Sequence, residues 1–129
     1  YRDLNYQEGL FNRKIENYMK KGMTYMEAYT LASQAVTVPG ASEHQAGLAF
    51  DIISNDYVTL DEGFAETKAG QWLSENSCKY GFILRYPKGK EDITGIEFEP
   101  WHFRYVGREA AEIINKEGIT LEEFWDKYL

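Results

Sequence analysis

The chain contains only two histidines, and each lies close in sequence to carboxylate residues. One stretch runs from Ser42 to Asp51 and contains His44, and the other runs from Glu99 to His102. A hydrolytic zinc ion usually takes three imidazole or carboxylate ligands and leaves a fourth position for water. A further carboxylate must take the proton of that water, and a cationic group must stabilise the developing oxyanion. The sequence offers each of these residue types.

Each stretch alone is weak evidence for a metal site. A single histidine is more often an ordinary core or surface residue than a ligand. The Glu-x-x-His step from Glu99 to His102 also differs from the helical His-Glu-x-x-His of many metalloproteases. Pro100 indicates a strand and a turn here, since proline interrupts a helix interior. The interpretation therefore depends on the whole set of spaced positions.

Seven positions form that set, as Ser-x-His-x-x-Gly-x-Ala-x-Asp followed by Glu-x-x-His. They are, in chain order, Ser42, His44, Gly47, Ala49, Asp51, Glu99 and His102. With these motifs the sequence resembles the VanY-type D-alanyl-D-alanine carboxypeptidases. That family belongs to a wider zinc group with lysostaphin-type peptidases, D-Ala-D-Ala metallopeptidases and the hedgehog signalling domain. The resemblance extends over nearly the whole chain, because the residues around both motifs agree as well.

The resemblance implies a metal centre with a defined division of roles. Zinc is expected on His44, Asp51 and His102, and Glu99 is expected to act as the catalytic base. Gly47 would let the backbone approach the metal loop closely.

The resemblance also implies substrate-binding residues. Tyr1 and Arg2 match the end of a Ser-Gly-Tyr-Arg motif of the family, so Arg2 is expected to bind the oxyanion and the substrate carboxylate. Ser42 is expected near that carboxylate, and Gln7 is expected as a further substrate contact. Trp101 is expected to wall the pocket, with core packing as the alternative.

Three charged or aromatic residues near the motifs are expected to have no role in the reaction. Arg85 and Tyr86 lie at the end of the predicted strand over 82–86 and are interpreted as a solvated strand end, with a position facing the cleft as the alternative. Glu43 precedes a ligand but would point away from it if the segment is extended, because side chains alternate along a strand.

The elements that must position these residues follow from periodicity and capping signals. Thr24 with Glu27 and Thr120 with Glu123 form capping boxes. Helices are expected over residues 4–21, 24–35, 61–80, 108–116 and 120–128, and strands over 49–54, 82–86, 93–99 and 102–106. Helices at both ends and strands between them favour an α+β fold with a mostly antiparallel sheet surrounded by helices. The resemblance implies the hedgehog/D-Ala-D-Ala peptidase type of this fold.

Two of the expected helices have clear apolar faces. The helix over 61–80 places Trp72 and Leu73 with two alanines on one face. The final helix is expected to bury its four apolar residues, which are Leu121, Phe124, Trp125 and Tyr128.

Composition limits the partners. The formal net charge of −7, from 14 basic and 21 acidic residues, disfavours binding to phosphate backbones, so no nucleic-acid partner is expected. The single cysteine, Cys78, allows no disulfide within the chain and is expected to be a buried, inert thiol. No apolar run approaches the length of a membrane span.

The organisation is expected to be simple. Residues 1–129 are interpreted as one zinc carboxypeptidase catalytic domain, without a linker or repeat. The chain begins at Tyr1 without an initiator methionine, which predicts a piece of a longer protein. A monomer is expected. By resemblance, the location is the cell envelope of a bacterium, secreted or held by an anchor outside this chain.

The preferred function is a D,D-carboxypeptidase that removes the terminal D-Ala from peptidoglycan stem peptides or their precursors. An L,D-carboxypeptidase acting on tetrapeptide stems shares the same motifs and stays open, as does a phage-type endopeptidase. A zinc-containing binding module without turnover is the rival from another class. Glu99 argues against that module, because a pure binder has no need of a catalytic base.

Overall fold

The computed structural model describes residues 2–129, so the expected match at Tyr1 lies outside the described residues. The helices in that part are α1 (Leu4–Met19), α2 (Tyr25–Ala35), α3 (Lys68–Asn76), α4 (Glu91–Thr94), α5 (Arg108–Glu117) and α6 (Leu121–Tyr128). Shorter 3-10 helices are η1 (Glu43–Ala46), η2 (Glu62–Glu66) and η3 (Ser77–Tyr80). The strands are β1 (Ala49–Asp51), β2 (Phe82–Leu84) and β3 (His102–Tyr105).

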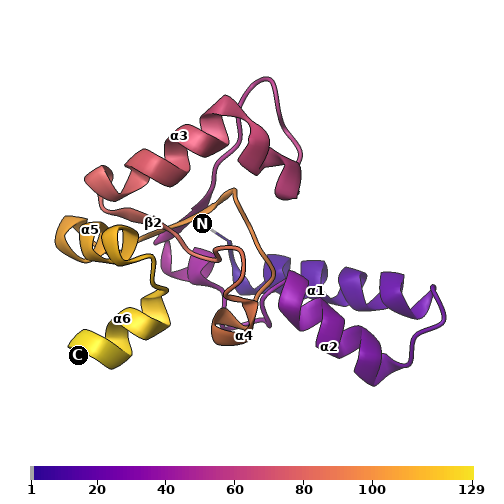
Figure 1. The fold of residues 1–129 in the computed structure, drawn as a ribbon. Coiled ribbons are helices and arrows are strands. Elements are labelled where there is room, and N and C mark those ends of the chain that lie inside the picture. The colour runs from indigo at the N-terminus through magenta and orange to yellow at the C-terminus, as the bar shows by residue number, and fades with distance from the viewer. Residues whose placement is uncertain (1) are drawn as a thin grey trace.

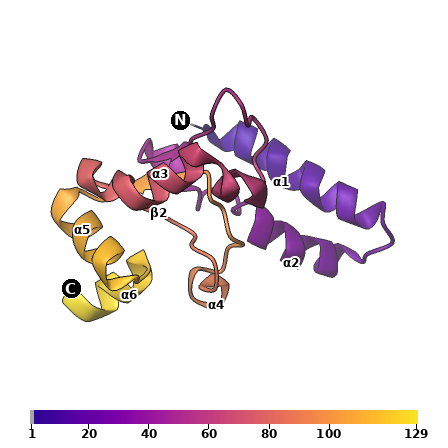
Figure 2. The same cartoon turned by 45° about the horizontal axis from the view of Figure 1, so that its top comes forward.

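The strands form one small antiparallel sheet in the order β1-β3-β2. In its register Asp51 lies opposite His102, and Ile83 lies opposite Arg104. Figures 1 and 2 place the α1–α2 hairpin at one end of the molecule and α5 with α6 at the other, with the sheet between them. The α+β class with an antiparallel sheet is therefore confirmed.

Each end of the molecule has its own apolar core. Phe11 and Ile15 of α1 pack with the small residues Ala28 and Ala32 of α2, which let the two helices approach closely. The second core joins η3, β2, α5 and α6 through Cys78, Ile83, Ala111, Ile114 and Leu121. Both predicted capping boxes are present, at the starts of α2 and α6. The prediction that Cys78 is buried is confirmed.

The predicted strand over residues 93–99 is wrong. Ile93 and Thr94 lie in α4 instead, and Gly95 ends that helix with a φ of +72°. After Gly95 the backbone of Glu97 donates to Gln34 O, and that of Glu99 donates to Tyr86 O. The segment therefore bonds to the last turn of α2 and to the loop after β2, and no continuous ladder forms.

The predicted helix over residues 61–80 is broken into η2, α3 and η3. Thr67 causes the first break, because it lies in extended backbone and accepts a hydrogen bond from Gly70 N–H as the N-cap of α3. Two helix-face predictions are also wrong. Trp72 is 51% exposed, and Trp125 and Tyr128 are 50% and 44% exposed. Among residues 2–129, no helix has the length and apolar character that crossing a bilayer requires.

Gly70 is expected to be indispensable for the contact between η2 and α3. A Cβ atom at this position would lie 2.1 Å from the backbone oxygen of Phe64, which cannot move freely. We expect Gly70→Ala to destabilise the protein by about 1–3 kcal/mol, as overpacking does. Urea unfolding followed by circular dichroism measures this change.

Gly9→Ala is the matched control, because Gly9 lies inside α1 and its added Cβ would meet only the flexible end of Arg13. That variant is expected to be more stable by about 0.5–1 kcal/mol, since alanine is the better helix former. Equal stability changes in both variants would contradict the steric argument.

Candidate metal centre

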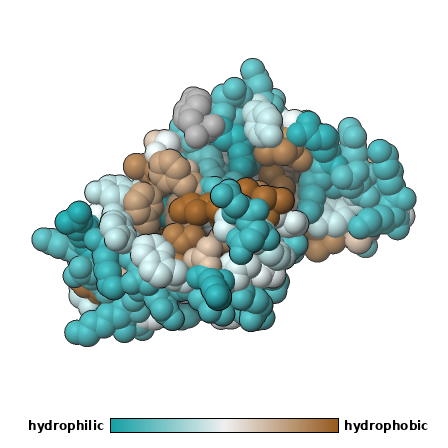
Figure 3. Space-filling view, turned by 90° about the horizontal axis from the view of Figure 1, so that it is seen from above, coloured by the Kyte–Doolittle hydropathy of each residue, from teal (hydrophilic) through white to brown (hydrophobic). Residues whose placement is uncertain are grey.

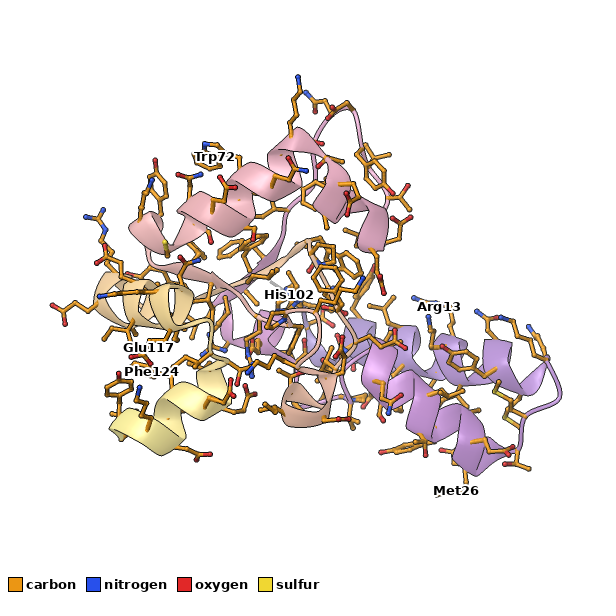
Figure 4. The ribbon with its side chains drawn as sticks, viewed as in Figure 1. Arg13, Met26, Trp72, His102, Glu117 and Phe124 are labelled. Atoms are coloured by element: carbon orange, nitrogen blue, oxygen red, sulfur yellow. The ribbon has the colours of Figure 1, made fainter. Side chains whose placement is uncertain are left out.

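Three side chains that come from separate parts of the sequence meet at one end of the β1–β3 pair. Asp51 ends β1, and its register partner His102 begins β3, so the pairing places both side chains on the same face. His44 joins them from η1, just before β1. One ligand atom from each of the three lies within 4.8 Å of the other two. Figure 4 shows His102 near the centre of the molecule, between the α1–α2 hairpin and the α5–α6 end.

Gly47 makes this geometry possible through its backbone conformation. It ends η1 with a φ of +70°, a left-handed value that favours glycine, and the chain then turns into β1. A Cβ atom at Gly47 would meet nothing within 4 Å, so the expected close backbone approach is wrong. Ala49 is buried, as expected for a packing residue.

The tautomer of His44 is set by the backbone. Its Nδ1 lies 3.1 Å from the carbonyl oxygen of Ala49, which can only accept a hydrogen bond. The hydrogen is therefore on Nδ1, and Nε2 directs its lone pair toward Asp51 Oδ1 at 3.2 Å. Metal-binding histidines commonly have this arrangement, with the second nitrogen donating to a fixed acceptor.

His102 is surrounded by carboxylates on both of its nitrogens. Nε2 lies 3.5 Å from Glu43 Oε2, and Nδ1 lies 3.5 Å from Asp51 Oδ1. Nδ1 also lies 3.3 Å from Glu99 Oε2. A proton on Nε2 would be shared with Glu43, which leaves Nδ1 to face the same point as His44 Nε2.

The donor set fits a zinc ion. Asp51 Oδ1 is buried and has no hydrogen-bond partner among the described residues, although two imidazole nitrogens approach it. Three potential ligand atoms that face one another at this distance favour a cation between them. Zinc bonds of 2.0–2.2 Å in a tetrahedron imply ligand separations of about 3.3 Å, and the two separations from Asp51 Oδ1 are 3.2 and 3.5 Å. Two imidazoles and one carboxylate are also ligand types that suit zinc.

The surroundings of the site lower the pKa values of Asp51 and Glu43 and raise that of His102. Burial disfavours the imidazolium of His102, but hydrogen bonds to the surrounding carboxylates outweigh burial and raise its pKa to about 10. Burial would raise the pKa of Asp51, but the two histidines that approach its carboxylate hold that pKa well below the usual range. Without a metal, the site thus favours positive charge at the point where the ligand atoms meet.

A cavity of about 300 Å³ opens onto these ligands. Arg2, Glu99 and Trp101 line it together with the three potential ligands. The guanidinium of Arg2 donates from Nη2 to Asp51 Oδ2 over 3.1 Å. The structure therefore brings six of the eight candidate site residues to one cavity.

The remaining two candidates, Gln7 and Ser42, do not line the cavity. Gln7 has no exposed surface, accepts a hydrogen bond from Arg2 Nη1 over 3.1 Å and donates to Thr37 O. In this structure it orients Arg2 and is not available to a solute. Ser42 is 6% exposed at the residue before η1 and is not part of the wall formed by the described residues.

Apolar side chains complete the cavity wall. They come from α1, the end of α2 and the segment after β1, and are Leu10, Ala35, Val36 and Leu60. Leu60 is 47% exposed, and Ile53 and Val58 in the same segment are exposed as well. Figure 3 shows apolar surface near the middle of the face seen from above, while both ends of the molecule are hydrophilic.

The sequence predicted that Glu43 points away from the ligands and that Arg85 and Tyr86 form a solvated strand end, and both predictions are wrong. Glu43 lies in η1 and not in extended backbone, so its carboxylate reaches His102. Arg85 and Tyr86 are 7% and 5% exposed. The ring of Tyr86 packs on His102 with centroids 4.8 Å apart, and Arg85 N–H donates to His102 O.

The sequence model of the VanY family, D-alanyl-D-alanine carboxypeptidase, matches residues 1–108. The chain belongs to the VanY family. A D-alanyl-D-alanine carboxypeptidase of Enterococcus faecalis (strain ATCC 700802 / V583) is 45% identical over 125 residues, which are 96% of this chain and 44% of that protein. The chain spans only between 36% and 53% of the length of the curated relatives it matches.

Solved structures of similar proteins share the fold. A variant of the vancomycin resistance D,D-pentapeptidase VanY, from a VanB-type cassette and in complex with Zn(II), is 44% identical with a TM-score of 0.85. The match covers 97% of this chain and 67% of that one. The LdcB LD-carboxypeptidase is 45% identical with a TM-score of 0.82, covering 98% of this chain and 56% of that one. The hedgehog/D-Ala-D-Ala peptidase type of fold expected from the sequence is thus confirmed.

Proposed function

We propose that this protein is a zinc-dependent carboxypeptidase that removes the terminal D-Ala from peptidoglycan stem peptides. The observation that carries the proposal is one cavity that joins a His/Asp/His ligand group to Glu99 and Arg2. Membership of the VanY family supports the substrate class. The proposed location is outside the cytoplasm of a bacterium, where such stem peptides occur, and the proposed state is a monomer.

The proposed ligand atoms are His44 Nε2, Asp51 Oδ1 and His102 Nδ1. Zinc, when bound there, would polarise the scissile carbonyl and lower the pKa of a water molecule. The protein contributes the orientation of these atoms. Ala49 O fixes the first imidazole, and the pairing of β1 with β3 places the other two ligands.

Glu99 is the proposed proton carrier. Its Oε2 lies 3.3 Å from His102 Nδ1 and therefore beside the ligand group. From this position the carboxylate can accept a proton from the attacking water and then donate it to the leaving amine. Its backbone is fixed on both sides, because Glu99 N–H donates to Tyr86 O and His102 N–H donates to Glu99 O.

Arg2 is the proposed cationic group for the oxyanion and the substrate carboxylate. Its guanidinium lines the cavity, and Gln7 holds it from the buried side. A preorganised donor of this kind needs no rearrangement as charge develops in the transition state. Trp101 and the apolar wall are proposed to surround the small side chain of the terminal residue. Gln7 and Ser42 do not line the cavity and are proposed to make no direct contact with the substrate.

A second candidate is an L,D-carboxypeptidase that acts on tetrapeptide stems, and the likeness to LdcB favours it over a phage-type endopeptidase. Synthetic pentapeptide and tetrapeptide stems, incubated side by side with zinc-loaded protein, separate the two carboxypeptidase activities by mass spectrometry. We expect loss of one alanine from the pentapeptide. Loss from the tetrapeptide alone would replace the D,D assignment by the L,D one.

The same assay tests the rival from another class. Stoichiometric zinc without loss of alanine from either peptide, in a protein whose fold is intact by circular dichroism, would favour a binding module. Because the chain spans only part of its relatives, the assay is repeated with the longer chain before that conclusion is drawn.

A further inference from the structure

A chain of buried and half-buried charged groups leads away from the metal centre to the C-terminal helix. Glu43 Oε1 accepts a hydrogen bond from Arg85 Nε over 2.7 Å. The two terminal nitrogens of Arg85 donate to both carboxylate oxygens of Glu122 in α6, over 3.0 and 2.6 Å. Arg104 Nη1 adds a second cationic contact to Glu43 Oε1 at 3.3 Å. The carboxylate of Glu43 is thus held on one oxygen by two arginines.

The other oxygen of Glu43 faces His102. Glu43 Oε2 lies 3.5 Å from His102 Nε2, and Tyr86 packs against the face of the same ring. These two contacts set the tilt of the imidazole and place a hydrogen-bond acceptor at Nε2. Nδ1 is then left to face Asp51 and Glu99. The backbone carbonyl of Ala49 performs the same task for His44, so each histidine has its own acceptor behind it.

Stability alone is a poor explanation for this arrangement. The side chains of Glu43 and Arg85 are 13% and 8% exposed, and taking such charges out of water costs about as much as their attraction returns. α6 is already attached by the buried Leu121 and by its own capping box. The network also contacts His102, and this contact can affect how that histidine binds a metal.

We infer that Glu43 is a positioning residue for the metal centre, and that Arg85, itself held by Glu122, keeps its carboxylate aimed at His102 Nε2. This inference rests on the proposed function, because it concerns how His102 is presented to zinc. Carboxylates behind metal-binding histidines typically change metal affinity or activity by 10–100-fold when removed. α6 thereby acts on the reaction without contacting the substrate.

Glu43→Ala is the main variant, and Glu43→Gln is the conservative one, since its amide oxygen can still accept from Nε2. Glu62→Gln is the matched control, because Glu62 is 66% exposed on its side chain and makes only a long contact with Lys88. Zinc affinity is measured by competition with a chromophoric chelator. Visible absorption of the cobalt-substituted proteins reports the ligand geometry, and circular dichroism reports the thermal unfolding of the metal-free forms.

We expect Glu43→Ala to weaken zinc binding by about 10–100-fold and to shift the cobalt bands. Glu43→Gln is expected to recover part of the affinity, and Glu62→Gln is expected to match the wild type. Arg85→Lys keeps the charge but loses the paired contact with Glu122, so its zinc affinity is expected to lie between those of Glu43→Ala and the wild type. If Glu43→Ala does not fold, Glu43→Gln decides the question through the cobalt bands and the zinc affinity.

Unchanged zinc affinity and cobalt bands in the Glu43 variants would overturn the positioning role, even if their unfolding temperature falls. The proposed function would survive that result, since the wild type would still bind zinc and hydrolyse stem peptides. A wild-type protein that binds no zinc would overturn both.

Discussion

Replacing Glu99 by glutamine is expected to lower kcat by about 10²–10⁴-fold, the usual contribution of a positioned acid or base. Glutamine has nearly the same shape but cannot accept a proton from water. Zinc binding should be retained, because Glu99 is not one of the three residues whose ligand atoms meet. Its backbone contacts with Tyr86 and His102 are also unaffected by the change.

Two measurements on Glu99→Gln check this expectation. Mass spectrometry of the pentapeptide follows the loss of alanine, and elemental analysis gives the zinc content. Glu97→Gln is the control, since Glu97 is exposed two residues away and carries the same change. Near wild-type turnover in Glu99→Gln would remove Glu99 as the base. Loss of zinc together with turnover would instead make Glu99 a ligand.

Local signals in the sequence were sufficient for most of the helices. Thr24 with Glu27 and Thr120 with Glu123 are bonded as capping boxes require, and Gly118 ends α5 in the left-handed conformation. Such signals depend on hydrogen bonds within four or five residues, so they can be read without knowledge of the tertiary structure. The break at Thr67 belongs to the same class but was obscured by the apolar residues around it.

The segment from Gly95 to Glu99 shows why a local pattern can fail. Ile96 and Phe98 alternate with acidic residues, which is typical of a half-buried strand. A strand also needs a neighbouring strand with free backbone groups. The backbone N–H groups of Glu97 and Glu99 instead find acceptors in two different elements, the last turn of α2 and the loop after β2. No pattern within the segment contains that information.

The proposed metal ligands could be predicted because seven spaced positions together resemble the motifs of a known family. The roles of Glu43 and Arg85 could not be predicted in this way, because the two residues are 42 positions apart and act through their contact with each other. Arg85 has the sequence context of a strand end, and only the approach of η1 and α6 buries it. Glu43 stands beside the proposed ligand His44, and Arg85 is a distant cation to which the sequence interpretation gave no role. This combination is the signal that could have indicated their contact.

Removing the metal is expected to abolish turnover and to lower the stability of the fold. In the metal-free protein, the buried Asp51 Oδ1 lacks a hydrogen-bond partner among residues 2–129 while two imidazoles approach it. A zinc ion bound only by the folded form stabilises it by about 2.7 kcal/mol when free zinc is 100 times its Kd. We therefore expect a chelator to shift urea unfolding to lower concentration by a corresponding amount.

Asp51→Asn is the variant that tests the origin of this stabilisation. Asparagine keeps the volume of the side chain but removes the charge that balances the metal, so zinc and chelator should give nearly the same unfolding curve for this variant. Returning zinc to the chelated wild type should restore both stability and turnover, whereas magnesium should not, because magnesium prefers oxygen ligands to imidazole. A wild type that unfolds identically with zinc and with chelator would show that the three ligands meet without a metal between them, and Asp51 would then act through its ion pair with Arg2 alone.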